Sequence, residues 1–548
     1  MMDQQQIPEQ PESIDPAASP MPAVGSSLSL RGLNVYVGER CLLHRADATF
    51  PAGKITVVVG GSGAGKSVLL RILAGLLPQA GESIQWTGSI GTANSPQQDS
   101  PTAARPRIGI VFQQFALFDE LSASSNVQFA LDHRGKQAKR QTAKQWTASQ
   151  WLEHLGVPTR TPVAALSGGQ KQRLAIARTL AASPDVLLYD EPTSGLDSAS
   201  GRLVADLIRE TQSVYHRTSI VVTHDYQTLL PIADKVLLFD PVKHDLIDVP
   251  RSEWEQIPAR MIPVSSLSAD ATAGATKPKP SALARLTGSF FETTGGALSA
   301  AFWLPLDLLP IVPRYRWAAR FTLHYLRLVA GPSAWLYLSI SGLIIGFTST
   351  YFTFRFLPFR LYTQPLLIDE LLSSIGFALY RVLVPILATI LVAARCGAAV
   401  AADVGVKQYG GQVDAMRTLG VAPRAYLLLP IVLAFVLGTP LLESIAFYSA
   451  RFVSMIAFSA SYPDVGPYFW QQHFSRNLVS ASGWMYAGWK WVAVKNVLCG
   501  LGTATIAYYQ GLAPKHSASD VSRSITSTVL WTTLFVLVVH FIIALLEF

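Results

Sequence analysis

The sequence predicts an α/β domain followed by an all-α domain that crosses a membrane several times. Between residues 28 and 250, short β-branched runs at 55–59, 186–189 and 219–223 alternate with amphipathic stretches, which is typical of a mainly parallel sheet. Beyond residue 286, long apolar segments dominate the chain. The 548 residues are 50% hydrophobic and 15% charged, a composition that excludes a protein disordered throughout.

The charge is distributed unevenly between the two halves. Residues 1–297 carry 27 Lys and Arg and 27 Asp and Glu, whereas residues 298–548 carry 17 and 9, so the net +8 belongs entirely to the apolar half. Basic residues beside apolar segments are a signal of membrane topology. The neutral first half argues against a nucleic-acid binder.

These changes in composition divide the chain into four predicted parts. Residues 1–27 contain no Lys or Arg, so we expect a disordered tail and no secretory signal. Residues 28–250 form the α/β domain, 251–285 a flexible linker and 286–548 the membrane domain. The three cysteines are too few for a disulfide framework and lack metal-ligand spacing, so no chemistry is assigned to Cys41, Cys396 and Cys499.

Five segments of the second half are long and apolar enough to be candidate membrane spans. They cover residues 328–354, 371–394, 425–450, 496–514 and 524–546. A shorter stretch, residues 300–313, is interrupted by prolines, and we expect an interfacial or half-inserted helix there.

Basic residues predict the orientation of these spans. Ten of the seventeen Lys and Arg residues of the second half fall on one side of the membrane, before the first span, between the second and third, and between the fourth and fifth. The positive-inside rule makes this side cytoplasmic and places the C-terminus on the opposite side.

A phosphate-binding loop directly follows the apolar run at 55–59. Its residues fit the pattern G-x-x-x-x-G-K-[ST], in which glycines let successive backbone N–H groups point at phosphate oxygens. In this pattern Lys66 bridges the β- and γ-phosphates and the Ser67 hydroxyl ligates Mg²⁺. The predicted ATP-binding loop consists of Gly60, Gly61, Ser62, Gly63, Ala64, Gly65, Lys66 and Ser67.

A second acidic element ends the apolar run at 186–189. Asp190 is placed to reach the Mg²⁺ ion or its water shell, and Glu191 is placed to polarise an attacking water molecule. A strand that ends in solvated acids is common by itself, but it is a weaker explanation downstream of a phosphate loop.

Further motifs resemble those of the ATP-binding-cassette (ABC) ATPases. Leu166-Ser167-Gly168-Gly169-Gln170 matches the signature of that family, and Gln113 and His224 follow apolar runs as its Q-loop and switch histidine do. Residues 192–197 resemble its D-loop. Together with the phosphate loop and the acidic element, these motifs occur in the order and spacing of the family, and the resemblance covers roughly residues 28–250.

The resemblance implies a head-to-tail dimer that encloses two ATP molecules. Ser167, Gly168, Gly169 and Gln170 are then expected to contact the ATP held by the other subunit. Glu191 is expected to be the general base, His224 to hold the γ-phosphate and the water, and Gln113 to join Ser67 and Asp190 at Mg²⁺. The family usually stacks adenine on an aromatic residue where this chain has Val37, with Tyr36 one position earlier.

The second half resembles the permease of Mla/Mce-type lipid transporters over roughly residues 286–548. The resemblance rests on the small-residue tract 393–405, the polar tract 414–421 and the tail motifs 509–511 and 521–529. Small residues permit close helix packing, and the polar tract is expected to form a cytosolic helix that docks onto the ATPase. The cassette also resembles the ATPase of such systems, here fused ahead of its permease.

Two charged residues lie inside the predicted spans. Arg381 and Glu443 are candidate lipid-pocket residues, because such charges are costly in lipid and usually functional. An ion pair with a structural role is the alternative, with equal weight. The family commonly has Arg-Glu where this chain has Arg381-Val382. His540, in the last span, is expected to be a hydrogen-bonded packing residue.

Together these features predict a fused half-transporter that acts as a homodimer in the inner (cytoplasmic) membrane and moves phospholipid or a related lipid. The resemblance implies a ring of MCE-domain proteins on the outer side and a STAS-domain protein on the ATPase as partners. One alternative is a half-transporter for drugs or other small hydrophobic molecules. Another is a mechanotransmitter, in which hydrolysis works an attached extracytoplasmic partner and nothing crosses the membrane.

Overall fold

The computed structural model describes residues 26–81, 84–91, 106–135, 146–260, 314–356, 360–479, 485–515 and 517–548. The predicted tail up to residue 25, most of the predicted linker and the predicted interfacial helix at 300–313 lie outside the described residues. The chain divides into two compact units. The first comprises Met1–Lys279 and Gly410–Val421, and the second comprises Pro280–Tyr409 and Ala422–Phe548.

The central sheet of the first unit is mainly parallel, as the sequence predicts. Its six strands lie in the order β5-β6-β7-β3-β8-β9, in which the β8–β9 pair is antiparallel and the other pairs are parallel. Val57 and Val59 face one hydrophobic core and Val58 faces another, because successive side chains of a strand alternate between the two faces of the sheet. The strands are β3 (Ile55–Val59), β5 (Ile108–Val111), β6 (Val186–Asp190), β7 (Thr218–Thr223), β8 (Lys235–Asp240) and β9 (Asp245–Val249).

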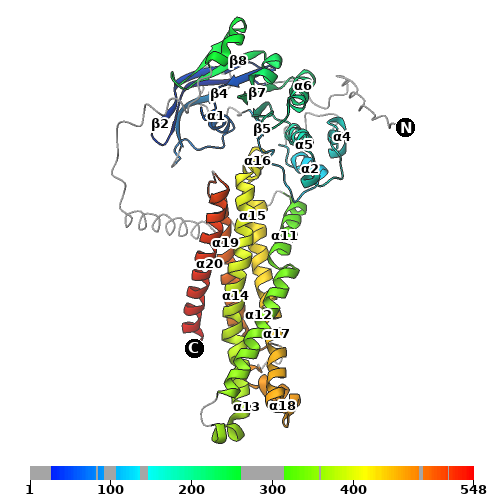
Figure 1. The fold of residues 1–548 in the computed structure, drawn as a ribbon, viewed down its shortest axis with the longest axis vertical. Helices are drawn as coiled ribbons and strands as arrows, with labels where there is room; N and C mark the ends of the chain where they lie inside the picture. The colour runs from blue at the N-terminus through cyan, green and yellow to red at the C-terminus, as the bar shows by residue number, and fades with distance from the viewer. Residues whose placement is uncertain are drawn as a thin grey trace, which may run out of the picture. The chain divides into compact units, whose positions relative to one another are not determined.

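A smaller antiparallel sheet and several helices complete this unit. Strands β1 (Leu28–Val37), β2 (Arg40–Phe50) and β4 (Ile84–Gly91) lie in the order β2-β1-β4. In the described part of this unit, side chains cap the N-termini of five helices by accepting backbone N–H groups, which satisfies donors that a helix start leaves unpaired. Figure 1 shows α2, α4 and α5 grouped together. The helices are α1 (Lys66–Leu73), α2 (Ala123–Asp132), α4 (Ala148–His154), α5 (Gly168–Ala181), α6 (Ser198–Tyr215), α7 (Tyr226–Leu229) and α8 (Ile257–Arg260).

The second unit is a bundle of long helices that run alongside one another (Figure 1). Two five-residue π-helical turns, Leu379–Leu383 and Ala393–Gly397, interrupt the helical run Leu367–Tyr409, and a third, Arg424–Leu428, begins the run Arg424–Ser461. The helices are α11 (Tyr315–Val329), α12 (Pro332–Arg355), α13 (Arg360–Ala378), α14 (Val384–Val392), α15 (Ala398–Tyr409), α17 (Leu429–Ser461), α18 (Gly466–Phe474), α19 (Trp489–Leu512) and α20 (Ala518–Glu547).

Small residues allow α12 and α17 to approach closely. A Cβ atom at Gly342 would lie 2.2 Å from the carbonyl oxygen of Ala446, and one at Gly346 would lie 2.2 Å from that of Ala450. Gly342 and Gly346 are four residues apart, which is the spacing of a G-x-x-x-G packing face in membrane helices. The opposite face of α12 exposes Leu336, Ile340 and Ile344.

Four helical runs among the described residues are long and apolar enough to cross a membrane. They are Tyr315–Arg355, Leu367–Tyr409, Arg424–Ser461 and Ala518–Glu547. The remaining predicted span, residues 496–514, is helical within α19 but is not among these four. That helix carries Lys490, Lys495 and Asn496 near its start and packs against α15, α17 and α20.

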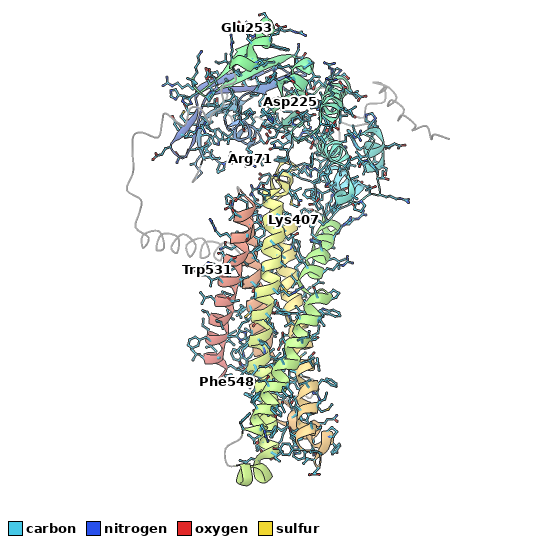
Figure 2. All side chains as sticks on the ribbon, viewed as in Figure 1. Arg71, Asp225, Glu253, Lys407, Trp531 and Phe548 are labelled. Carbon is cyan, nitrogen blue, oxygen red and sulfur yellow. The ribbon has the colours of Figure 1, made fainter. Side chains whose placement is uncertain are left out.

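Polar side chains tie the bundle together at two levels. The Tyr325 hydroxyl of α11 donates to Asp403 of α15 at 3.0 Å, and Lys407 contacts the same carboxylate. Farther along, Thr389 Oγ1 and His540 Nε2 are 2.8 Å apart, which confirms the predicted hydrogen bond of His540. Figure 2 shows Lys407 and Phe548 at well-separated levels of the bundle.

Candidate functional site

The ends of four parallel strands bring the predicted nucleotide residues together. The phosphate loop follows β3, Gln113 lies two residues beyond β5, Asp190 ends β6 and His224 follows β7. These strands are neighbours in the sheet order β5-β6-β7-β3. Ligand sites of parallel sheets form at the carboxyl ends of the strands, which is where these side chains lie.

The phosphate loop wraps around a buried lysine. Lys66 Nζ donates to the carbonyl oxygens of Gly60 and Gly61, each at 2.9 Å. Burial lowers the pKa of Lys66, and the nearby carboxylates of Glu191 and Asp190 partly oppose this. Gly65 has φ +106°, and a Cβ atom there would lie 2.7 Å from Leu42 Cδ1, so this turn requires glycine.

The two strongest candidate magnesium ligands are in direct contact. The Ser67 hydroxyl donates to Asp190 Oδ1 at 2.9 Å. Burial raises the pKa of Asp190, while the Ser67 hydrogen bond and the positive charges of Arg71 and Lys66 oppose the rise. A hydroxyl and a carboxylate, both oxygen donors beside a phosphate loop, suit Mg²⁺.

Glu191 occupies a strained backbone position at the centre of the site. Its φ is +47°, in the left-handed region that non-glycine residues rarely adopt, and its N–H donates to the Val222 carbonyl at 2.9 Å. Oε1 lies 3.1 Å from His224 Nδ1, and Oε2 accepts a hydrogen bond from Gln113 Nε2 at 3.1 Å. Lys66 Nζ is 4.0 Å from the same carboxylate. Lys66, Gln113, Glu191 and His224 therefore form one cluster.

A cavity of about 310 Å³ opens beside the phosphate loop. Val37, Arg40 and Leu42 line it together with loop residues and Glu191, whereas Tyr36 is not among the lining residues. The wall near the usual adenine position thus holds an aliphatic side chain and a guanidinium. Planar guanidinium groups stack on aromatic rings, which makes Arg40 a candidate that the search for an aromatic residue missed.

The signature residues lie apart from this cluster. Ser167 caps α5 by accepting the Gln170 N–H at 3.3 Å, and the Gln170 side chain accepts the Ser167 N–H at 3.0 Å. Among the described residues, the hydrogen bonds and ion pairs found do not join this segment to the phosphate loop. Ser167 and Gly168 are exposed at the start of the helix.

The structure adds Arg178, which sequence patterns did not indicate. This buried guanidinium of α5 donates to the carbonyl oxygens of Phe115, at 3.2 Å, and Ala116, and it lies 5.3 Å from the centre of the Phe118 ring. Phe115 and Ala116 both have positive φ, at 63° and 49°. Burial lowers the pKa of Arg178 to about 10, so the side chain remains charged at neutral pH. Arg178 thereby holds the loop that follows Gln113.

The helix α16 (Gln412–Thr418) packs on the same loop within the first unit. A Cβ atom at Gly411 would lie 3.5 Å from the side chains of Ala116 and Phe112. Gln412 Nε2 donates to Asp119 Oδ2 at 3.1 Å, and Ala415 joins the hydrophobic core. The predicted docking of the 414–421 tract onto the α/β domain is confirmed.

Two family models match the two parts of the chain in order. The ABC transporter model matches residues 43–194, and the model described as Permease MlaE matches residues 326–546. The chain is a fusion of an ABC transporter ATPase with an MlaE permease. The cluster around Lys66 and the signature segment therefore belong to the ABC part, and the helical bundle corresponds to the permease.

Relatives of the ATPase part include proteins of transport systems. The sulfate/thiosulfate import ATP-binding protein CysA of Bordetella parapertussis is 34% identical over 236 residues, which is 42% of this chain and 64% of that protein. CysA of Caulobacter vibrioides is also 34% identical, over 41% of this chain and 65% of that protein. This chain thus spans just under two thirds of the length of these curated relatives.

Solved structures similar to the chain include parts of ABC transporters. Dimeric MJ0796, a bacterial ABC transporter cassette, is 29% identical, with a TM-score of 0.32, and covers 40% of this chain and 96% of its own. The cbiO1 protein of Clostridium perfringens is 26% identical, with a TM-score of 0.35, and covers 45% and 96%.

In the MlaE part, Arg381 has an acidic partner that sequence reasoning missed. Arg381 lies 2.6 Å from Glu547 Oε1, and Lys495 contacts the other oxygen of this fully buried carboxylate. The ion pair corresponds to the structural alternative considered from the sequence, but the acid is Glu547 rather than Glu443. Glu547 lies one residue beyond the predicted last span, so a search for charges inside spans could not find it.

Glu443 lies in a different environment from Arg381. It is 5% exposed on α17, and its Oε2 accepts a hydrogen bond from Asn496 Nδ2 at 2.8 Å. It also lines a cavity among aromatic side chains. The two predicted intramembrane charges are therefore not paired with each other.

Proposed function

We propose that this chain is an ATP-driven half-transporter, active as a homodimer, that moves phospholipid or a related lipid between the membrane and an extracytoplasmic carrier. The observation that carries the proposal is the joining of an ABC ATPase to an MlaE permease in one chain. A cassette by itself leaves the cargo open, whereas the permease part is similar to a lipid-transporter family.

The cluster at the strand ends suits hydrolysis of ATP. Lys66 and the loop N–H groups hold the phosphates, and His224 contacts both Glu191 and the region where the γ-phosphate would lie. Glu191 accepts a proton from the attacking water molecule. At the same time the water oxygen forms a bond to the γ-phosphorus, and the bond between the γ-phosphorus and the ADP oxygen breaks. Held by His224 and Gln113, the Glu191 carboxylate needs little reorganisation for this role.

Mg²⁺ fits the oxygen donors Ser67 and Asp190, which already touch. Gln113 could complete this set through its side-chain carbonyl. When bound, the ion would neutralise charge on the β- and γ-phosphates. Gln113 would then connect the nucleotide to the loop that contacts α16.

The exposed start of α5 supports the dimer. Its free N–H groups and its helix dipole favour an anion, yet within the described residues they do not reach this chain's own phosphate loop. A second copy in head-to-tail arrangement would bring Ser167, Gly168, Gly169 and Gln170 to the γ-phosphate bound by the first copy.

We place the protein in the cytoplasmic membrane with the ATPase in the cytoplasm, because basic residues cluster at that end of the spans. An MCE-domain ring outside and a STAS-domain protein on the ATPase are the proposed partners, on the resemblance of both halves to such systems.

Lipid movement is testable in proteoliposomes. Fluorescent phospholipid should leave the membrane for a soluble acceptor when ATP is present, and this transfer should be lost in Glu191→Gln. Hydrolysis that responds to hydrophobic drugs, in a protein that retains no lipid, would instead support a drug transporter. Full ATP hydrolysis without any lipid or drug transfer would support the mechanotransmitter.

A further inference from the structure

A cavity of about 540 Å³ lies within the second unit, and its lining comes from four separate segments of the described chain. Tyr380 comes from the π-helical turn after α13, and Glu443 to Tyr448 come from α17. Leu478 and Val479 follow α18, Tyr486 lies three residues before α19, and Trp489 begins that helix. The volume falls in the range of small-molecule sites. The nucleotide chemistry described above uses none of these residues.

Aromatic rings form the walls of this cavity. Tyr380 packs edge-on against Phe447 and Tyr486, with ring centres 5.1 Å apart in both pairs. Phe447 and Tyr448 have ring centres 5.8 Å apart. Tyr448 and Trp489 are 59% and 39% exposed, so the cavity has an aromatic rim that is open to the surroundings of the bundle.

Glu443, which lines this cavity, has one buried carboxyl oxygen without a partner among the described residues. Glu443 is 5% exposed, and Asn496 occupies its Oε2 at 2.8 Å. Oε1 has no hydrogen-bond partner among the residues that the structure describes. Leaving a buried acceptor unpaired is costly, which indicates that something else completes this group.

A cation lies close to the other side of the cluster. Arg451 Nη1 donates to the Tyr486 hydroxyl at 3.1 Å, and the guanidinium lies 5.8 Å from the centre of the Trp470 ring. Arg451 follows Glu443 by about two turns along α17. The cavity therefore has an acidic group within it and a basic group against its wall.

We propose that this cavity binds the alkylammonium headgroup of a zwitterionic phospholipid, with the ammonium among the rings beside Glu443 and the phosphate toward Arg451. Aromatic faces and a carboxylate attract an organic cation, and such cages recognise quaternary ammonium groups. A primary ammonium can donate a hydrogen bond to the unpaired oxygen of Glu443, whereas a trimethylammonium group is held by charge and by the ring faces alone, so the site suits both ethanolamine and choline headgroups. This proposal rests on the proposed lipid transport and specifies its substrate class.

Arg381 and Lys495 do not compete for this role. Both contact the buried carboxylate of Glu547, so each is already held by an anion within the bundle. A lipid phosphate has little to gain from cations that are already paired in this way.

The test uses the full-length protein in proteoliposomes that contain equal amounts of phosphatidylcholine, phosphatidylethanolamine and phosphatidylglycerol. After gentle extraction, mass spectrometry measures the lipids that remain bound. We expect the choline and ethanolamine lipids to exceed the glycerol lipid by about threefold or more relative to the membrane. An excess of choline over ethanolamine lipid would assign the site to the quaternary group.

Variants then locate the preference. Glu443→Gln and Tyr486→Leu should abolish it, whereas Asp369→Asn and Tyr351→Leu, an acid and an aromatic residue outside the cavity, should retain it. Wild-type protein provides a test that is independent of folding, because tetramethylammonium chloride should displace the bound zwitterionic lipid and sodium chloride at equal concentration should not.

The outcomes separate this proposal from the proposed function. Bound lipid with the same composition as the membrane, or no displacement by tetramethylammonium, overturns the headgroup site and leaves lipid transport intact. Retention of no lipid of any class overturns both.

Discussion

The nucleotide pocket of the first unit and the aromatic cavity of the second unit are assembled from the sequence in different ways. In the nucleotide pocket, the functional side chains lie at the ends of buried strands. A short sequence segment therefore determines both the identity of such a residue and its position in the fold. In the cavity, Tyr380, Glu443 and Tyr486 come from three distant segments and meet only through helix packing. Phosphate binding depends on local backbone geometry, so it is visible in the sequence as short motifs. An aromatic cage depends on tertiary structure and has no such motif.

The largest expected effect tests the nucleotide pocket. Glu191→Gln keeps the shape of the side chain but removes the base, so we expect turnover to fall by about 10²- to 10⁴-fold while ATP still binds. Steady-state hydrolysis and nucleotide binding by the purified protein measure the two quantities. Glu153→Gln, on the exposed side of α4, should leave both unchanged, and near-normal turnover in Glu191→Gln would remove Glu191 from the role of base.

A second variant tests binding in the same pocket. Lys66→Ala removes the buried ammonium and should weaken ATP binding by roughly 10- to 100-fold, the value of one strong charge-assisted contact. Titration with a fluorescent ATP analogue measures the change, with Lys54→Ala as the exposed control. Unchanged affinity would contradict the phosphate-loop assignment and, with it, the contrast drawn between the nucleotide pocket and the aromatic cavity.

A third variant addresses the contact between α5 and the loop after Gln113. Arg178→Met leaves the carbonyl oxygens of Phe115 and Ala116 without their donor, a loss of about 2–3 kcal/mol. We expect the melting temperature of the ATPase part to fall by roughly 4–12 °C. Differential scanning fluorimetry measures this, and the exposed substitution Arg202→Met is the control. A shift equal to that of the control would show that Arg178 does not hold the loop.

The smallest effect is expected at α16. Gln412→Ala removes one partly exposed hydrogen bond to Asp119, worth about 0.5–1.5 kcal/mol, so transport per ATP should fall by no more than roughly tenfold. The ratio of lipid transferred to ATP hydrolysed measures this coupling, and Gln85→Ala on β4 serves as the control. If Gln412→Ala hydrolysed ATP normally but transferred no lipid, the docking of α16 would depend on this one hydrogen bond far more than its geometry indicates.

Much of the first unit was predictable from the sequence because its strands and motifs are local. The predicted strands correspond to β3, β6 and β7, and the structure brings Lys66, Gln113, Asp190, Glu191 and His224 together. Arg178 was not predictable, because its partners are carbonyl oxygens in a loop more than sixty residues away. No residue-type pattern marks an arginine whose partners are backbone atoms.

The second unit was predictable as a set of apolar helices but less so in its polar contacts. The predicted segment 328–354 matches α12 to within four residues, whereas α17 continues eleven residues beyond the predicted 425–450 and α20 begins six residues before the predicted 524–546. The partner of Arg381 could not be identified, since several acids were available and only packing selects Glu547. Likewise, Glu443 was singled out as an intramembrane charge, but Tyr380 and Tyr486 of its aromatic surroundings lie more than sixty residues before it and about forty after it.

The position of α16 affects how firmly the ATPase stays attached to the permease. In a transporter made of separate ATPase and permease chains, a weakened docking helix lets the motor diffuse away. Here α16 and the ATPase belong to one polypeptide, so the docking equilibrium is intramolecular and is governed by an effective local concentration. Dilution cannot separate the two parts. Substitutions in α16 that would dissociate a two-chain complex should here lower only the fraction of time that α16 is bound to the ATPase.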